Sequence, residues 1–274
     1  MGAEEESQND PQSSREGNSA SFALENISAG ETQVRYLRSY RVGAPELLFL
    51  HGYGSRLQSY LPLLEYLSDS YSVTAPLIFG VGYLEQQPHT YRAFAEILRN
   101  FIQATGLESY HLVGHSYGAN VALLSARSSD RARSVALINP VVPGSIGLRG
   151  VSRGVRLLFK DALSGEGELQ GILSNPEIGV AYARNFFAMP GTFARTTLSM
   201  GDFRFDGPEL PCPGMLLYSE MDALFDPDGS CLKGLTASFR RLSIERVNGK
   251  SHNWVMYYPE LAASKTLAFL NAQV

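Results

Sequence analysis

Cysteine is nearly absent from this chain, which contains only Cys212 and Cys231. Two cysteines are too few for a disulfide framework, so we expect two free thiols in a reducing, cytoplasmic environment. An excess of one charge is also missing, because 27 acidic and 23 basic side chains leave a formal net charge of −4. This charge gives no reason to expect nucleic acid or an anionic membrane as a partner.

Long hydrophobic runs are lacking too. No apolar stretch approaches the ~18 residues of a membrane span, so we expect no membrane-spanning helix. No Cys/His cluster has metal-ligand spacing, and neither a phosphate-binding loop ending in Lys-Ser/Thr nor a dinucleotide-binding glycine pattern is present. We therefore expect no metal and no cofactor. Residues 1–20 are polar and lack the hydrophobic centre of a secretory signal, which predicts a disordered N-terminal tail.

Strands and helices alternate over most of the remaining chain. Apolar or alternating segments bounded by turn residues predict eight strands, at 22–27, 33–37, 46–50, 71–75, 110–113, 135–138, 215–218 and 242–247. The first two form a hairpin, and helical patterns lie between most of the others, as in βαβ units. At 274 residues, the length fits one α/β domain with a mainly parallel sheet.

The region from 141 to 210 interrupts this alternation. It contains several helix-like pieces, and no segment in it has a convincing strand pattern. The sequence therefore predicts a tail at 1–20, a core formed by 21–140 and 211–274, and a helical cap at 141–210 inserted over the sheet.

The motif G-x-S-x-G places Ser116 between Gly114 and Gly118, after an apolar strand and before a helix. A serine at such a sharp strand-to-helix turn projects its hydroxyl away from the sheet. The amide of Tyr117, at the start of the helix, is then a candidate donor to a developing oxyanion. The pattern predicts a nucleophilic serine.

A serine hydroxyl needs a base within hydrogen-bonding reach, and that base needs a partner to orient it. His252 lies just beyond the last predicted strand, where a loop can carry its imidazole over Ser116. Asp222 follows the strand at 215–218, and the 30 residues from it to His252 hold one helix and one strand. Glu220 and Asp226 are competing carboxylates on the same loop.

The other four histidines have plainer interpretations. We expect His51 to order its own loop and His115 to follow from the serine motif. His89 and His111 are expected on a loop or at an exposed strand edge.

The ordered motifs resemble those of the α/β-hydrolase fold. The matching residues are His51-Gly52-Tyr53-Gly54, the Ser116 turn, Asp222 and His252, in the serine–acid–histidine order of that family. The resemblance implies an eight-stranded, mainly parallel sheet with helices on both faces and a helical cap after strand 6. It also implies that the amide of Tyr53 is the second oxyanion donor.

The resemblance favours Asp222 over its two competitors, because Asp222 has the family's Asp-x-x-x-x-Pro spacing to Pro227. The alternative acid position after the sixth strand is occupied by Asn139, which is no carboxylate. One departure is the loop at 76–83, where the family's polar positions are apolar. This departure favours an apolar substrate.

The resemblance implies a serine hydrolase that cleaves a small carboxylic ester through an acyl-enzyme intermediate. We expect Leu158, Phe159, Phe187 and Trp254 to contact that substrate. Two alternatives remain open: C–C bond hydrolysis or lyase chemistry with the same triad, and a ligand receptor with little or no turnover. A serine nucleophile argues against dehalogenase and epoxide hydrolase chemistry, which uses a carboxylate. The oligomeric state does not follow from the sequence.

Overall fold

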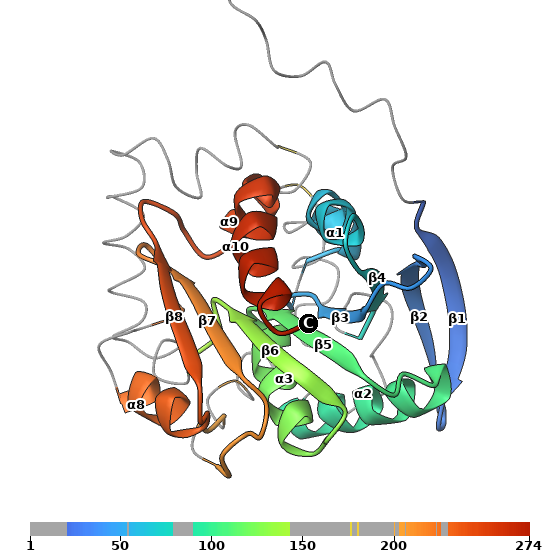
Figure 1. Cartoon of the computed structure of the whole chain (residues 1–274), viewed down its shortest axis with the longest axis horizontal. Coiled ribbons are helices and arrows are strands. Elements are labelled where there is room, and N and C mark those ends of the chain that lie inside the picture. Colours follow the sequence, from blue (N-terminus) through green and yellow to red (C-terminus); the bar gives the residue numbers. More distant parts are fainter. Residues whose placement is uncertain are drawn as a thin grey trace, which may run out of the picture.

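The computed structural model describes residues 21–53, 55–78, 90–142, 203–205, 207–222, 224–225 and 230–274, together with Pro176, Val180 and Met200. Its centre is an eight-stranded sheet with the strand order β1-β2-β4-β3-β5-β6-β7-β8 (Figure 1). The strands are β1 (Ala23–Ala29), β2 (Thr32–Ser39), β3 (Glu46–Leu50), β4 (Ser72–Pro76), β5 (Tyr110–His115), β6 (Ala132–Ile138), β7 (Gly214–Ser219) and β8 (Leu242–Val247).

Strand direction divides the sheet into two parts. The β1–β2 and β2–β4 pairs are antiparallel, whereas every pair from β4 to β8 is parallel. The predicted α/β class, with its mainly parallel eight-stranded sheet, is therefore confirmed.

Helices cover both faces of the sheet (Figure 1). Side chains of α1, α9 and α10 join one hydrophobic core, and those of α2, α3 and α8 join the other. The helices are α1 (Leu61–Ser68), preceded by the 3-10 turn η1 (Leu57–Tyr60), α2 (Tyr91–Thr105), α3 (Tyr117–Arg127), α8 (Ser230–Ala237), α9 (Trp254–Tyr257) and α10 (Pro259–Asn271). The four-residue helix α9 was not predicted.

The continuous apolar sequence of β3 is explained by its two buried faces. Leu48 and Leu50 join the core beneath α2 and α3, while Leu47 and Phe49 join the core beneath α1 and α10. Successive side chains of a strand point to opposite faces, so a strand covered on both sides is hydrophobic throughout.

The predicted tail at 1–20 lies outside the described residues, and so does most of the predicted cap at 141–210. The helical cap therefore stays a prediction. Phe203, Phe205 and Leu210, near the end of that region, are buried in the core beneath α2 and α3.

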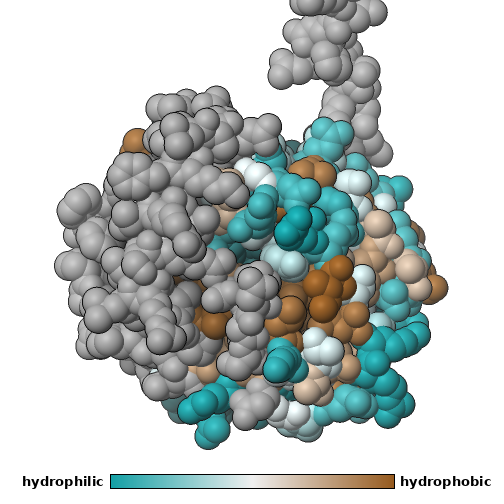
Figure 2. All heavy atoms as spheres, turned by 90° about the vertical axis from the view of Figure 1, so that its left-hand side faces the viewer, coloured by the Kyte–Doolittle hydropathy of each residue, from teal (hydrophilic) through white to brown (hydrophobic). Residues whose placement is uncertain are grey.

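Large hydrophobic side chains are exposed at separate places on the described surface, including Leu24 on β1, Tyr40 after β2 and Ile244 on β8. Figure 2 shows the left-hand side of Figure 1, where hydrophobic residues form a group bordered by hydrophilic ones. In the described part of the chain, every helix is too short or too polar to cross a membrane.

Candidate active site

Ser116 lies at the junction between the end of β5 and the start of α3. Its backbone dihedrals are φ 55° and ψ −125°, a region that residues other than glycine seldom occupy. Such strain persists only where the surrounding structure enforces it, and a strained strand-to-helix turn is typical of a nucleophile elbow.

The two glycines of the motif allow α3 to pack closely against the sheet. A Cβ on Gly114 would come within 2.5 Å of the Gly118 carbonyl oxygen. A Cβ on Gly118 would collide with the backbone carbonyl of Leu50 in β3. Side chains at these positions would push α3 away and release the turn that holds Ser116.

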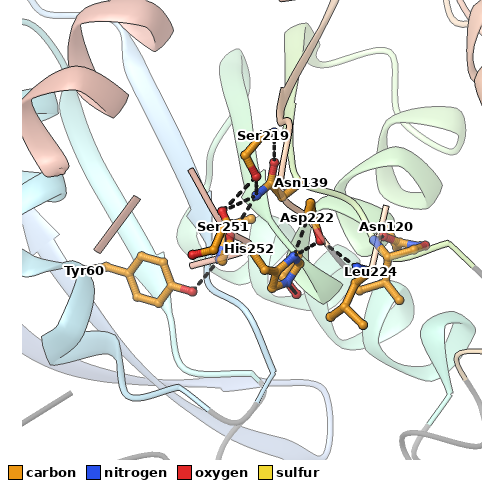
Figure 3. Close-up of polar contacts among 11 residues, drawn as sticks. Tyr60, Asn120, Asn139, Ser219, Asp222, Leu224, Ser251 and His252 are labelled. Atoms are coloured by element: carbon orange, nitrogen blue, oxygen red, sulfur yellow. Dashed lines mark hydrogen bonds and ion pairs between the residues drawn. The ribbon is translucent and has the colours of Figure 1, made fainter. Parts of the chain in front are cut away.

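The structure brings Ser116, His252 and Asp222 into one chain of contacts. His252 Nε2 is 2.7 Å from Ser116 Oγ. His252 Nδ1 is 2.9 Å from each carboxylate oxygen of Asp222 (Figure 3). The three residues follow β5, β8 and β7, whose carboxyl ends lie at the same edge of a parallel sheet.

Asp222 is fully buried, and its side chain has two hydrogen-bonding partners among the described residues. Besides the imidazole of His252, the amide of Leu224 donates to its Oδ1 at 2.7 Å. The competing carboxylate of Glu220 is exposed and accepts from the amide of Gly249 at 3.2 Å. Asp226 lies outside the described residues.

The loop that carries His252 is held by its backbone as well as by its imidazole. The His252 carbonyl accepts one hydrogen bond from His115 Nε2 at 3.0 Å and another from Asn139 Nδ2 at 2.8 Å. Asn139 Nδ2 also donates to Ser219 Oγ at 2.9 Å (Figure 3). Both lone pairs of the His252 carbonyl oxygen therefore accept hydrogen bonds, which hold the backbone of His252 in place.

Burial keeps the histidines beneath Ser116 neutral. It lowers the pKa of His115 to about 3, with a further contribution from His252, and lowers the pKa of His51 to about 4. Burial also raises the pKa of Tyr60, whose hydroxyl is 2.7 Å from His115 Nδ1. These side chains therefore act as neutral hydrogen-bonding groups rather than as charges.

The two residues expected to supply oxyanion amides lie close together. Tyr53 follows Gly52 beyond the end of β3, and Tyr117 begins α3, with 5.7 Å between their ring centroids. The preceding amide, that of Gly52, donates to the Tyr60 hydroxyl at 2.9 Å. The use of the Tyr53 and Tyr117 amides as oxyanion donors stays a prediction.

Two sequence-based expectations need correction. Trp254 is fully buried in the core beneath α1 and α10, because the chain turns into α9 directly after His252, so we no longer expect it to contact substrate. His111 is not on an exposed edge but fully buried in the central strand β5, with its Nδ1 2.8 Å from Ser134 Oγ. The remaining expected contact residues, Leu158, Phe159 and Phe187, lie outside the described residues.

Three side chains around the site were not expected from the sequence to support the catalytic residues. They are Tyr60, His115 and Asn139, which hold the backbone rather than reach the nucleophile. From the sequence, Asn139 was interpreted only as a position without a carboxylate. In the structure it has a positive φ of 45°, which asparagine tolerates well. An asparagine directly after a buried strand is therefore a sequence signal for such a turn. Across the ranges that the structure describes, no cluster of three or more His, Cys, Asp or Glu could hold a metal ion.

Curated proteins of known sequence match part of this chain. A chain from Cupriavidus necator, the dihydrolipoyllysine-residue acetyltransferase component of the acetoin cleaving system, is 36% identical over 148 residues. That match covers 47% of this chain and 39% of the relative. The chain thus spans less than half the length of the curated relatives that it matches first.

Solved structures match over most of the chain. A bacterial membrane phospholipase A has a TM-score of 0.71 at 23% identity, covering 92% of this chain and 86% of its own. Naproxen esterase from Bacillus subtilis has a TM-score of 0.62 at 18% identity, covering 92% of each chain. Epoxide hydrolases and haloalkane dehalogenases share the fold as well. At these identities the likeness shows the fold alone.

The family model covers more of the sequence than the curated relatives above do. The model of the alpha/beta hydrolase family matches residues 47–265, a range that begins in β3, ends in α10 and includes Ser116, Asp222 and His252. Together with the parallel sheet and the serine turn at the end of β5, this match shows that the chain belongs to the alpha/beta hydrolase family.

Proposed function

We propose that this protein is a serine hydrolase that cleaves a carboxylic ester with Ser116 as nucleophile. The observation that carries the proposal is the unbroken contact from Ser116 Oγ through His252 to Asp222, at 2.7 and 2.9 Å. These distances are within the reach that proton transfer from a hydroxyl to a general base requires.

The steps follow from this geometry. Ser116 Oγ attacks the ester carbonyl carbon while its proton passes to His252 Nε2, and Asp222 stabilises the resulting imidazolium. The amides of Tyr53 and Tyr117 donate to the carbonyl oxygen as it becomes negatively charged. His252 then returns the proton to the departing alcohol, which leaves an acyl group on Ser116. A water molecule then attacks the acyl carbon while His252 takes its proton. The bond from the acyl carbon to Ser116 Oγ breaks, His252 returns the proton to Ser116 Oγ, and the carboxylic acid leaves.

A serine at the elbow favours this chemistry over that of dehalogenases and epoxide hydrolases, whose ester intermediate forms on a carboxylate. We propose an apolar ester of modest size, because the sequence at 76–83 is apolar where the family resemblance leads us to expect polar residues. The alternatives to ester hydrolysis are C–C bond cleavage by the same three residues and ligand binding without turnover of an ester.

The test compares wild type with Ser116→Ala on nitrophenyl esters of graded acyl length and on a ring-cleavage substrate. Ser125→Ala is a matched control, because Ser125 is a buried serine in α3, the helix that begins directly after Ser116. Ester turnover and fluorophosphonate labelling that are lost only in Ser116→Ala would support the proposal. Turnover of the ring-cleavage substrate alone would favour C–C chemistry, and labelling that persists in Ser116→Ala would refute the assigned nucleophile.

A further inference from the structure

A chain of hydrogen bonds runs beneath Ser116 from the end of β3 to the His252 loop. The amide of Gly52 is 2.9 Å from the Tyr60 hydroxyl, which is 2.7 Å from His115 Nδ1. His115 Nε2 is 3.0 Å from the carbonyl oxygen of His252. Tyr60 and His115 are both buried, so these bonds are shielded from water.

The direction of each bond in this chain is determined by chemistry. The carbonyl of His252 can only accept, so His115 Nε2 carries the proton. Because burial keeps His115 neutral, with its pKa at about 3, its Nδ1 has a lone pair and accepts from the Tyr60 hydroxyl. The Tyr60 oxygen in turn accepts from the Gly52 amide.

This chain of hydrogen bonds contacts both the residue that carries the candidate base and the loop that carries a candidate oxyanion donor. At one end, it holds the main chain of His252 while the imidazole of the same residue contacts Ser116 and Asp222. At the other end, it holds the amide of Gly52, the residue directly before the candidate oxyanion donor Tyr53.

We propose that Tyr60 is a positioning residue for His252, acting through His115, and that its hydroxyl also holds the loop carrying the Tyr53 amide. This inference rests on the proposed function, because it assigns a role in placing the proposed general base. Tyr60 itself does not touch the reacting atoms in this assignment.

Close packing explains why the hydroxyl group matters at this place. A Cβ added to Gly52 would be 2.9 Å from the Tyr60 oxygen, 3.1 Å from His115 Nδ1 and 3.2 Å from Ser116 Cβ. The strand end, the tyrosine and the serine turn are therefore in direct contact. Loss of the hydroxyl would leave the Gly52 amide and His115 Nδ1 without this partner inside a packed region, where they would shift to find others.

The first experiment compares Tyr60→Phe with Tyr71→Phe. Tyr71 is a matched control because it is a buried tyrosine of the same core, with its hydroxyl 3.0 Å from Asn271 Oδ1. After titration of active sites with a fluorophosphonate, we expect Tyr60→Phe to lower kcat about 10- to 100-fold with little change in KM, as for a misplaced catalytic group. Tyr71→Phe should retain the wild-type kcat.

A spectroscopic measurement tests positioning without a substrate. The proton between His252 Nδ1 and Asp222 should give a low-field NMR resonance, and we expect Tyr60→Phe, but not Tyr71→Phe, to shift or broaden it. If the wild type hydrolyses no ester, the proposed function fails, while this resonance still tests the placement of His252.

A second pair of variants covers the case in which Tyr60→Phe does not fold. His115→Gln keeps an N–H donor that can reach the His252 carbonyl, whereas His115→Leu removes it. We expect His115→Gln to retain at least about tenfold more kcat than His115→Leu. The inference would be overturned if Tyr60→Phe kept the wild-type kcat and an unchanged resonance. It would also be overturned if His115→Gln and His115→Leu lost the same amount of kcat.

Discussion

Asn139 and Ser219 form two reciprocal hydrogen bonds across the carboxyl ends of β6 and β7. Asn139 Nδ2 donates to Ser219 Oγ at 2.9 Å, and the Ser219 amide donates to Asn139 Oδ1 at 2.9 Å. The same Nδ2 donates to the carbonyl of His252 at 2.8 Å, and Ser219 Oγ donates to that of Ser251 at 2.8 Å. One buried amide thus ties two strand ends to the loop that presents the candidate base.

Asn139→Asp should be destabilising although it barely changes the shape of the side chain. A carboxylate cannot donate to the His252 carbonyl, and a buried carbonyl and carboxylate would face each other. We expect a loss of about 1–3 kcal/mol in the free energy of unfolding, measured by urea denaturation, together with lower kcat. Asn26→Asp, at an exposed position on β1, is the control. Equal stability of the two variants would show that the Asn139 amide is dispensable.

Asp222→Asn should lower kcat by roughly four orders of magnitude, the size of the effect seen for the orienting aspartate of serine proteases. The cause is that an amide neither stabilises the imidazolium of His252 nor selects the correct tautomer. Glu220→Gln is the control on the same loop, since that side chain bonds to the Gly249 amide. The kcat of each variant is measured by steady-state kinetics on a nitrophenyl ester. A comparable loss of kcat in Glu220→Gln would contradict the assignment of Asp222 as the orienting acid.

Stability should fall in acid because His51 and His115 are buried as neutral groups. Their pKa values are lowered from 6.5 to about 4 and about 3, so between these values and pH 6.5 the unfolded chain binds more protons than the folded one. The stabilisation is therefore complete above about pH 6.5, declines progressively as the pH falls below that value, and is lost once the pH has fallen through about 4 for His51 and about 3 for His115. Each histidine contributes a slope of up to about 1.4 kcal/mol per pH unit.

Urea denaturation between pH 4 and pH 7.5 checks this expectation. His111, whose pKa burial lowers to about 4, adds to the same effect. His115→Gln removes one of these histidines and should flatten the acid limb relative to wild type. Identical slopes in both proteins would show that the titration of His115 does not contribute.

The predicted cap is tested by alanine substitution of Leu158, Phe159 and Phe187. If these residues line the acyl or alcohol site, their truncation should change the relative kcat/KM for short and long esters, mainly through KM, while Ser116 keeps its reactivity with a fluorophosphonate. Trp254→Phe is the control, because that side chain is buried beneath α1 and α10 and should affect stability without changing the preference. Equal losses on all esters would argue against a pocket at these residues.

The sequence was most informative where local pattern and local structure coincide. The predicted bounds of β3 and β8 match the structure, because an apolar or alternating segment between turn residues is a property of neighbours along the chain. The same reasoning was wrong for His111, since the polarity of one residue does not reveal that its strand lies in the middle of the sheet. The helix α9 was missed because four residues are too few to show helical periodicity.

By itself, the sequence determined the fold class, the serine turn and the order of the three candidate catalytic residues, because these depend on short motifs and on alternation along the chain. Only the tertiary structure decided how they meet. Ser116 and His252 are 136 residues apart, and the parallel strands β5 and β8 bring their loops to one edge of the sheet. The support from Tyr60 and Asn139 comes from contacts between distant segments, which leave no pattern in the spacing of residues.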